Sequence, residues 1–234
     1  MWLKGVITLK KIGLIIADES EYVIVREWAE KNSAERFDFY TREGHLFMLD
    51  DATKVHSVLC GIGTVNAATA ATYLALEGVQ AIFNFGLSGG ISGISRGEFM
   101  VGTSFLEHDF DLTPLGYELC QKPSQKSVFE ADKRLVNLIC EAYPFIKQGV
   151  AVSGDSFICD DKRRDFFKNK YNAMSCDMES SAIAYVCDLA NIPFLSLRKI
   201  SDDAGNDANN SYKGALNIEG EEVLKILFEI MKKA

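Results

Sequence analysis

Two glutamates occupy helical faces where packing predicts apolar side chains. Glu21 is followed by Ile24, Val25 and Trp28 at three, four and seven positions. Residues at these spacings share one face of a helix, so Glu21 belongs to the face that packs inward. A carboxylate on such a face needs a reason, and chemistry at a binding site is one.

Glu179 repeats this pattern in the segment that begins CDMES. It shares a helical face with Ala182, Ile183 and Val186. Both glutamates are expected in the first turn of their helices, where unpaired backbone N–H groups and the helix dipole favour an anion by about 0.3–1 kcal/mol. A capping role is therefore the alternative to a functional role for each of them.

Asp202 follows an apolar run at residues 192–200, IPFLSLRKI. The run predicts a buried strand, so Asp202 should lie just past its carboxyl end, where open α/β sheets collect ligands. An N-cap or turn role within Ser201-Asp202-Asp203 is the alternative. Because all three acids fall at strand-to-helix junctions or strand ends, we expect them on one rim of the sheet, in one cleft.

Separate carboxylates of this kind suit the departure of a purine base from a ribose. The N-glycosidic bond breaks through an oxocarbenium-like state, which needs a protonated base as leaving group and an activated nucleophile at the sugar. One acid can serve each end of the reaction.

Alternating strand and helix patterns supply the framework for these residues. Strands are predicted at residues 11–17, 37–41, 45–49, 55–60, 81–85, 99–105, 149–153, 172–176 and 192–200. Helices are predicted from the first junction to about residue 31 and at 64–77, 131–142, 161–169, 179–190 and 219–232. This alternation indicates an α/β layered domain with a largely parallel sheet, in which 86–90 (GLSGG) closes the strand at 81–85.

Composition limits the class of protein. With 234 residues, 47% of them hydrophobic, the chain can bury one core, so we expect a single domain over 11–234 after an N-terminal extension, 1–10. A net charge of -8 argues against nucleic acid as a partner. No apolar run approaches the roughly 20 residues of a membrane span and no secretory signal is visible, so we expect a cytoplasmic protein without a membrane partner. The six scattered cysteines and three histidines indicate buried free thiols and no metal site.

Seven segments, in this order, resemble the methylthioadenosine/S-adenosylhomocysteine nucleosidases of the nucleoside phosphorylase superfamily. They are KIGLIIADESE (11–21), GIGTVNAA (61–68), NFGLSGG (84–90), HDFDLTPLGYE (108–118), VSGDSFI (152–158), CDMES (176–180) and LRKISDDA (197–204). The resemblance implies a three-layer α/β/α nucleoside-phosphorylase-like fold with a central twisted mixed sheet. It also implies a homodimer without cofactor that hydrolyses methylthioadenosine, S-adenosylhomocysteine or 5'-deoxyadenosine to release adenine in methionine salvage.

The same resemblance implies individual roles. Glu21 would activate the attacking water, and Asp202 would donate a proton to purine N7. Glu179 and the backbone of Met178 would hold the ribose hydroxyls. The other expected substrate-binding residues, around the purine or the alkylthio group, are Phe157, Ile158, Ser201, Ile62 and Tyr212. Ordinary core packing would be the preferred interpretation of Phe157 and Tyr212 without the resemblance.

Two residues depart from the pattern of this family. Leu87 stands where these nucleosidases commonly carry a small hydroxyl residue; Ser88 follows at once and is kept as an expected binding residue, although its hydroxyl could point elsewhere. Asp18, one turn from Glu21, stands where an apolar residue is common, and its charge could raise the pKa of Glu21 or change the substrate. The choice among thionucleosides, aminofutalosine-type substrates and an inosine-type base is therefore open.

Other functions compete with this interpretation. A phosphate-dependent phosphorylase would need cationic groups, but the segments 83–85 (FNF) and 18–21 (DESE) would repel an anion. A nucleotide-binding module is suggested by 61–66 (GIGTVN), which lacks the third glycine of the dinucleotide fingerprint. The basic cluster 162–164 is expected to be a solvated helix face, and the polar segment 203–211 could close over the ligand.

Overall fold

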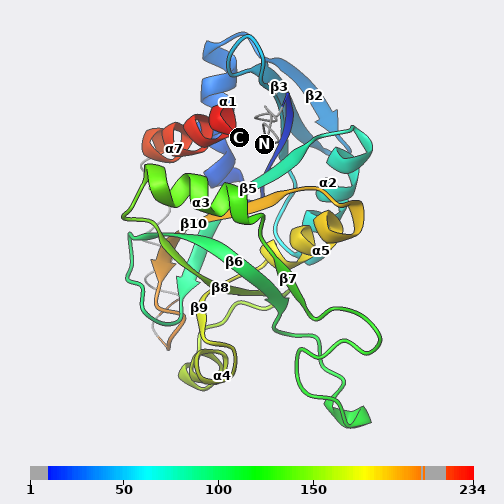
Figure 1. The fold of residues 1–234 in the computed structure, drawn as a ribbon, viewed down its shortest axis with the longest axis vertical. Helices are drawn as coiled ribbons and strands as arrows, with labels where there is room; N and C mark the ends of the chain where they lie inside the picture. The colour runs from blue at the N-terminus through cyan, green and yellow to red at the C-terminus, as the bar shows by residue number, and fades with distance from the viewer. Residues whose placement is uncertain (1–9, 207, 209–219) are drawn as a thin grey trace, which may run out of the picture.

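The computed structural model of the chain describes residues 10–206, 208 and 220–234 (Figure 1). The strands are β1 (Lys11–Ile16), β2 (Glu35–Phe39), β3 (Arg42–Met48), β4 (Lys54–Leu59), β5 (Ala81–Gly90), β6 (Phe99–Glu107), β7 (Val128–Glu130), β8 (Lys147–Ser153), β9 (Ala173–Asp177) and β10 (Phe194–Asp202). The helices are α1 (Glu19–Lys31), α2 (Thr64–Leu76), the short 3-10 helix η1 (Thr113–Leu115), α3 (Lys133–Ala142), α4 (Asp161–Tyr171), α5 (Ser180–Ala190) and α7 (Gly220–Lys233).

The long strand β5 organises the sheet. It pairs in parallel with β1 on one side and with β10 on the other, and β4, β3 and β2 continue outward from β1. From β10 the order runs through β6 and β8 to β9, and β9 returns to pair antiparallel with the end of β5. The sheet is therefore mixed, and its second half curls back on itself beside the carboxyl end of β5.

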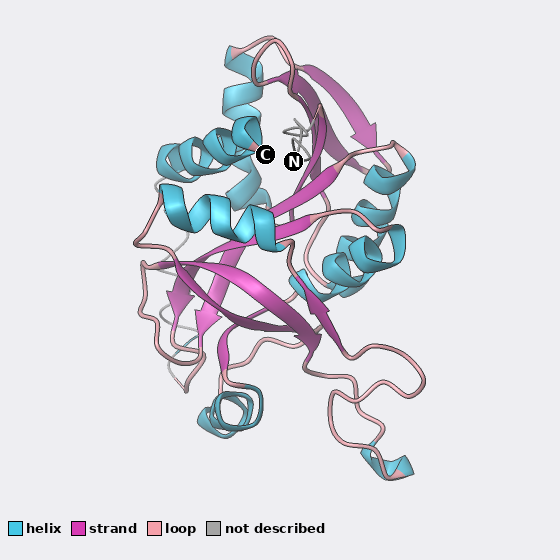
Figure 2. Cartoon of the chain, in the orientation of Figure 1, coloured by secondary structure: helices cyan, strands magenta, loops and turns pink. Residues whose placement is uncertain are grey.

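Helices cover the sheet from two sides, which agrees with the layered α/β fold expected from the sequence. The helices α1, α3 and α7 form one group and α2 and α5 form the other (Figures 1 and 2). Fully buried aliphatic side chains of β1 and the alanine-rich α2, such as Leu14 and Ala70, join one core with α5 and α7. None of the helices in the described residues has the length and apolar content that a membrane span needs.

The glycine-rich segment 86–90 corrects the sequence-based prediction. It continues β5 as a fully buried strand and does not close it as a turn. The reason is a pairing between distant segments: Gly89 is paired with Cys176 of β9 on one side and with Asp202 of β10 on the other. A Cβ on Gly89 would lie 2.9 Å from Cys176 Sγ and 3.0 Å from Asp202 Oδ1, so this close approach requires glycine.

Other differences are smaller. The strand β10 extends to Asp202 with an irregularity after Ile200, so Asp202 is its last residue and does not lie beyond it. β7 and η1 were not predicted, since three residues carry too little periodicity. All six cysteines are free, as expected, but Cys159 is exposed and Cys140 is only partly buried. The first strand begins at Lys11, and residues 1–9 of the expected extension lie outside the described part.

Candidate active site

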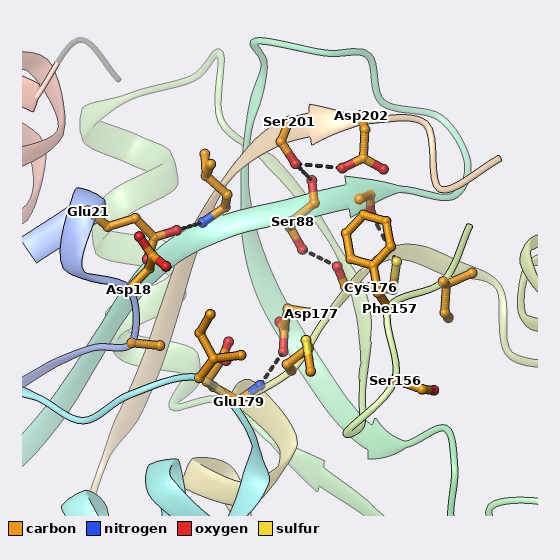
Figure 3. Close-up of a pocket in the computed structure, with 16 residues that line it drawn as sticks. Asp18, Glu21, Ser88, Ser156, Phe157, Cys176, Asp177, Glu179, Ser201 and Asp202 are labelled. Atoms are coloured by element: carbon orange, nitrogen blue, oxygen red, sulfur yellow. Dashed lines mark hydrogen bonds between the residues drawn. The ribbon is translucent and has the colours of Figure 1, made fainter. Parts of the chain in front are cut away.

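A cavity of about 260 Å³ opens between the carboxyl-terminal ends of β5 and β10 and the segments that follow β1, β4, β8 and β9 (Figure 3). Of the ten site residues predicted from the sequence, nine line it: Glu21, Ile62, Ser88, Phe157, Ile158, Met178, Glu179, Ser201 and Asp202. The tenth, Tyr212, lies outside the described residues, as does part of the segment 203–211. The three acids predicted to share one cleft therefore do so.

The Glu21 side chain is almost completely shielded from solvent. Its side chain is buried at the third residue of α1, and Oε1 accepts a hydrogen bond of 2.7 Å from the backbone N–H of Leu87 on β5. Burial raises the pKa of Glu21 to about 8; the Leu87 N–H and Arg198 oppose this rise, and Glu179 adds to it. A carboxyl with such a pKa exchanges protons close to neutral pH, as a general base must.

Asp18 has a structural role as well as an electrostatic one. It is the N-cap of α1, where Oδ1 accepts the Ser20 N–H at 2.8 Å. Its negative charge raises the pKa of Glu21, which is the direction expected from the sequence. This effect is smaller than the effects of burial, the Leu87 N–H, Glu179 and Arg198.

Glu179 belongs to a buried ionic cluster. It is the N-cap residue of α5, not a member of its first turn as predicted, and its side chain makes no cap hydrogen bond there. Its Oε1 instead accepts the Gly63 N–H at 3.1 Å, and Oε2 lies 3.7 Å from Nη1 of Arg198. Burial raises the pKa of Glu179 to about 6, although Arg198 opposes the rise. The carboxylate is thus aimed into the cavity and not at its helix.

Asp177 provides the cap that Glu179 does not. Its Oδ1 accepts the N–H groups of Glu179 and Ser180 at 3.0 and 2.9 Å, and its Oδ2 lies 3.2 Å from Nε of Arg198. Burial alone would raise the pKa of Asp177, but Arg198 and these N–H groups hold it below the ordinary value. Asp177 is therefore the buried ion-pair partner of Arg198.

Asp202 lies at the other end of the cavity from Glu21 (Figure 3). Its side chain is buried; Oδ2 accepts the Ser201 hydroxyl at 2.6 Å and Oδ1 accepts the Ala204 N–H at 2.8 Å. Burial raises the pKa of Asp202, and the Ser201 hydroxyl and the Ala204 N–H limit the rise. An acid held above its ordinary pKa can deliver a proton at a pH where most aspartates are already ionised.

Apolar side chains reach the cavity from the segment after β8, from the turn before α2 and from Met178, which follows β9. Phe157 is 41% exposed, Ile158 is buried and Met178 is half-buried. Ile62 is 49% exposed at the edge of the cavity. A partly exposed aromatic ring beside a cavity is suited to stacking on a planar ligand.

The Ser88 hydroxyl does not take the place of the small hydroxyl residue that the family commonly has at position 87. Its Oγ donates to the carbonyl oxygen of Cys176 at 2.8 Å, so the hydroxyl ties β5 to β9 (Figure 3). The Leu87 side chain, 9% exposed, lines the cavity in its place, and the backbone N–H of Leu87 supplies the contact with Glu21.

The sequence-based reasoning missed Arg198 and Asp177. Arg198 is 1% exposed on β10 and donates to Asn84 Oδ1 at 2.5 Å. It is a cation in the region that was expected only to repel anions, so that prediction was incomplete. A signal was present: an arginine in the apolar run IPFLSLRKI, two residues after Ser196, marks a polar stripe on a buried strand.

The charge balance of the site still disfavours an anion. The carboxyl groups that line the cavity are Asp18, Glu21, Asp177, Glu179 and Asp202. Arg198 is engaged by two of them. Within the described residues, no three His, Cys, Asp or Glu side chains are grouped to hold a metal ion. The arrangement can protonate a leaving group at one end and take a proton from water at the other.

The chain is similar to known proteins over almost its whole length. The profile of the phosphorylase superfamily matches residues 11–232. The 5'-methylthioadenosine/S-adenosylhomocysteine nucleosidase of an Exiguobacterium species is 33% identical over 232 residues, which cover 95% of this chain and 98% of the relative.

Solved structures show the same likeness. The Neisseria meningitidis 5'-methylthioadenosine/S-adenosylhomocysteine nucleosidase, in complex with methylthio-immucillin-A, is 29% identical with a TM-score of 0.87 and covers 97% of this chain and 100% of that chain. Futalosine hydrolase of Helicobacter pylori is 25% identical with a TM-score of 0.86, over 95% and 97% of the two chains. The chain thus belongs to the phosphorylase superfamily and, within it, to the 5'-methylthioadenosine/S-adenosylhomocysteine nucleosidase family.

Proposed function

We propose that the protein is a purine nucleosidase that hydrolyses the N-glycosidic bond of an adenine nucleoside with a modified 5' position. Methylthioadenosine, S-adenosylhomocysteine and 5'-deoxyadenosine are its expected substrates. The observation that carries this proposal is the presence of two buried carboxyls of raised pKa, Glu21 and Asp202, at opposite ends of one cavity. Family membership supports it, since the relatives are named for this reaction.

Asp202 is the proposed general acid. Its proton passes to N7 of the purine while the electron pair of the C1'–N9 bond moves into the base, so adenine leaves as a neutral molecule. Phe157 stacks on the purine, and Ile158 contacts its edge through backbone groups. Ser201, which donates to Oδ2 of Asp202, keeps the carboxyl oriented.

Glu21 is the proposed general base. The oxygen of a water molecule bonds to C1' of the oxocarbenium-like sugar, and Glu21 takes the proton that the water loses. Because its pKa is raised to about 8, Glu21 in the empty site is mostly protonated at neutral pH, so the hydrolytic step draws on the ionised fraction. Glu179 and the Met178 backbone hold the ribose hydroxyls by hydrogen bonds, with the Glu179 carboxylate as acceptor.

The same charges favour water over phosphate as the nucleophile. Phosphate at C1' would lie beside Glu179 and Asp177, which already engage the guanidinium of Arg198, and no Lys or Arg is among the described residues that line the cavity. Like charges in a buried site repel strongly. A phosphorylase is therefore the less favoured function, even with Arg198 close to the site.

The 5' substituent sets the finer specificity. Ile62 and Tyr212 are proposed to line the alkylthio pocket. Leu87 presents an apolar side chain near Glu21, where the family commonly has a hydroxyl. The similarity to a futalosine hydrolase keeps an aminofutalosine-type nucleoside as a second candidate substrate.

A homodimer belongs to this proposal, as does a cytoplasmic role in methionine salvage. Val65 is 75% exposed at the start of α2, and Leu115 is 71% exposed on a segment that projects from the body (Figure 1). Exposed apolar side chains on a projecting segment are typical of subunit contacts. Sedimentation at several protein concentrations, with Leu115→Glu as the variant, tests the association.

The nucleosidase activity is tested with a panel of nucleosides in the presence and absence of phosphate. We expect free adenine and an unphosphorylated sugar in both conditions, with no rate increase on adding phosphate. Mass analysis of the sugar separates the two reactions, and a ribose 1-phosphate product would disprove hydrolysis. Inclusion of aminofutalosine and inosine identifies the preferred substrate.

A further inference from the structure

Helix α4 contacts both segments that carry the proposed purine-binding and proton-donating groups. Its first turn contains the basic cluster Lys162, Arg163 and Arg164, for which the sequence suggested only a solvated face. Lys162 is exposed, but the other two are partly buried and make specific contacts. The prediction of a solvated face is therefore wrong for Arg163, whereas Arg164 forms ion pairs with Asp161 and Asp165 of its own helix.

Arg163 holds the segment that follows β8. Its Nη2 donates to the Ser156 hydroxyl at 2.9 Å and lies 3.2 Å from Nδ1 of His108. His108 is 2% exposed, and burial lowers its pKa to about 4, so the ring is neutral and its Nδ1 can accept from the guanidinium. Ser156 lines the cavity and directly precedes Phe157. The contact with Arg163 therefore fixes the stretch of chain from which the Phe157 ring extends.

Arg164 lies beside the segment that follows β10 and is linked to it through Asp161. It forms an ion pair of 2.9 Å with Asp161, whose other oxygen accepts from Nδ2 of Asn206 at 2.6 Å. The guanidinium also lies against Gly205, where a Cβ would be only 2.7 Å from Nη1. The preceding residue, Ala204, donates its N–H to Oδ1 of Asp202. The chain that orients the proposed acid is therefore anchored to α4.

We propose that Arg163 and Arg164 are positioning residues that set the two sides of the purine pocket independently. Arg163 places the Phe157 segment, and Arg164, through Asp161, places the segment that orients Asp202. The proposal rests on the function proposed above, in which Phe157 stacks on the base and Asp202 protonates it. Neither arginine is expected to touch the substrate.

The two arginines should have different kinetic effects. Stacking by Phe157 is present in both the ground state and the transition state, so its loss weakens binding and raises KM. Proton delivery by Asp202 matters only in the transition state, so misplacing it lowers kcat. A helix that merely contributed stability would affect both parameters together or neither.

The experiment compares Arg163→Gln, Arg164→Gln and Lys162→Gln, which remove the same charge within one helical turn. With methylthioadenosine, we expect Arg163→Gln to raise KM about tenfold at nearly constant kcat, the effect of losing one charge-assisted hydrogen bond. Arg164→Gln should lower kcat about tenfold at nearly constant KM. Lys162→Gln should match the unmodified protein, and Arg163→Lys should recover part of the lost binding.

Further variants keep the test decisive. If Arg164→Gln does not fold, as judged by thermal unfolding, Asn206→Ala removes the same anchor at an exposed position and should also lower kcat. Equal changes in KM and kcat, or behaviour like Lys162→Gln, would overturn the proposal. Asp202→Asn is measured alongside: full activity there would instead contradict the proposed acid, independently of the arginines.

Discussion

Replacing Glu21 by glutamine should abolish hydrolysis and at the same time stabilise the protein. The wild-type side chain is 5% exposed, yet it carries an ionisable group that the folded protein keeps protonated up to unusually high pH. Glutamine has nearly the same shape, and its Oε1 can still accept the N–H of Leu87. The substitution therefore removes the cost of burying an ionisable group with little loss of contact.

The size of the effect follows from the two pKa values. Below pH 4.5 the carboxyl is protonated in both the folded and the unfolded chain, and it causes no difference. Between pH 4.5 and about 8 only the unfolded chain ionises, so the wild type progressively loses stability relative to the variant. At pH 7 the difference in unfolding free energy should be about 3 kcal/mol, or about 6–12 °C in Tm.

Urea and thermal unfolding of both proteins at several pH values, at one protein concentration, measure this difference. Glu19→Gln is the matched control, because this glutamate lies in the same helical turn with its side chain 66% exposed. We expect the Glu21→Gln advantage to grow from pH 5 to pH 8 and the control difference to stay constant. An advantage for Glu21→Gln that does not change over this range would refute the assignment of Glu21 as a desolvated carboxyl.

Three further outcomes are expected. Asp202→Asn should lower kcat for adenine release by about 10²- to 10⁴-fold with a small change in KM, measured by product chromatography. In the Asp202→Asn background, where the second carboxyl of the proposed mechanism no longer titrates, the residual kcat/KM should rise as pH increases toward 8, because Glu21 must lose its proton; a rate already constant above pH 6 would contradict its role. Arg198→Met should lower the unfolding free energy by about 3–5 kcal/mol, because Asp177 and Glu179 would lose their buried cation; urea unfolding measures this loss.

The local pattern of the chain was sufficient to predict most of the elements and three of the acids that line the cavity. The periodicity around Glu21 placed it on an inward face, because the side-chain direction in a helix follows from spacing alone, whereas Glu179 is buried as the N-cap residue of α5. Asp202 was placed at a strand end for a similar reason, since an apolar run and its end are local features. These properties need no knowledge of the distant chain.

Only the tertiary structure determined how those residues act. Segment 86–90 is a strand and not a turn because β9 and β10 supply hydrogen-bond partners that are far away in the sequence. The pKa of Glu21 is set by burial and by the N–H of Leu87, Glu179 and Arg198, and these three residues come from other parts of the chain. Arg163 likewise gains its partners from segments before it in the chain. Desolvation and pairing are properties of the assembled site, so the sequence determined which groups are present and the fold determined their protonation, orientation and partners.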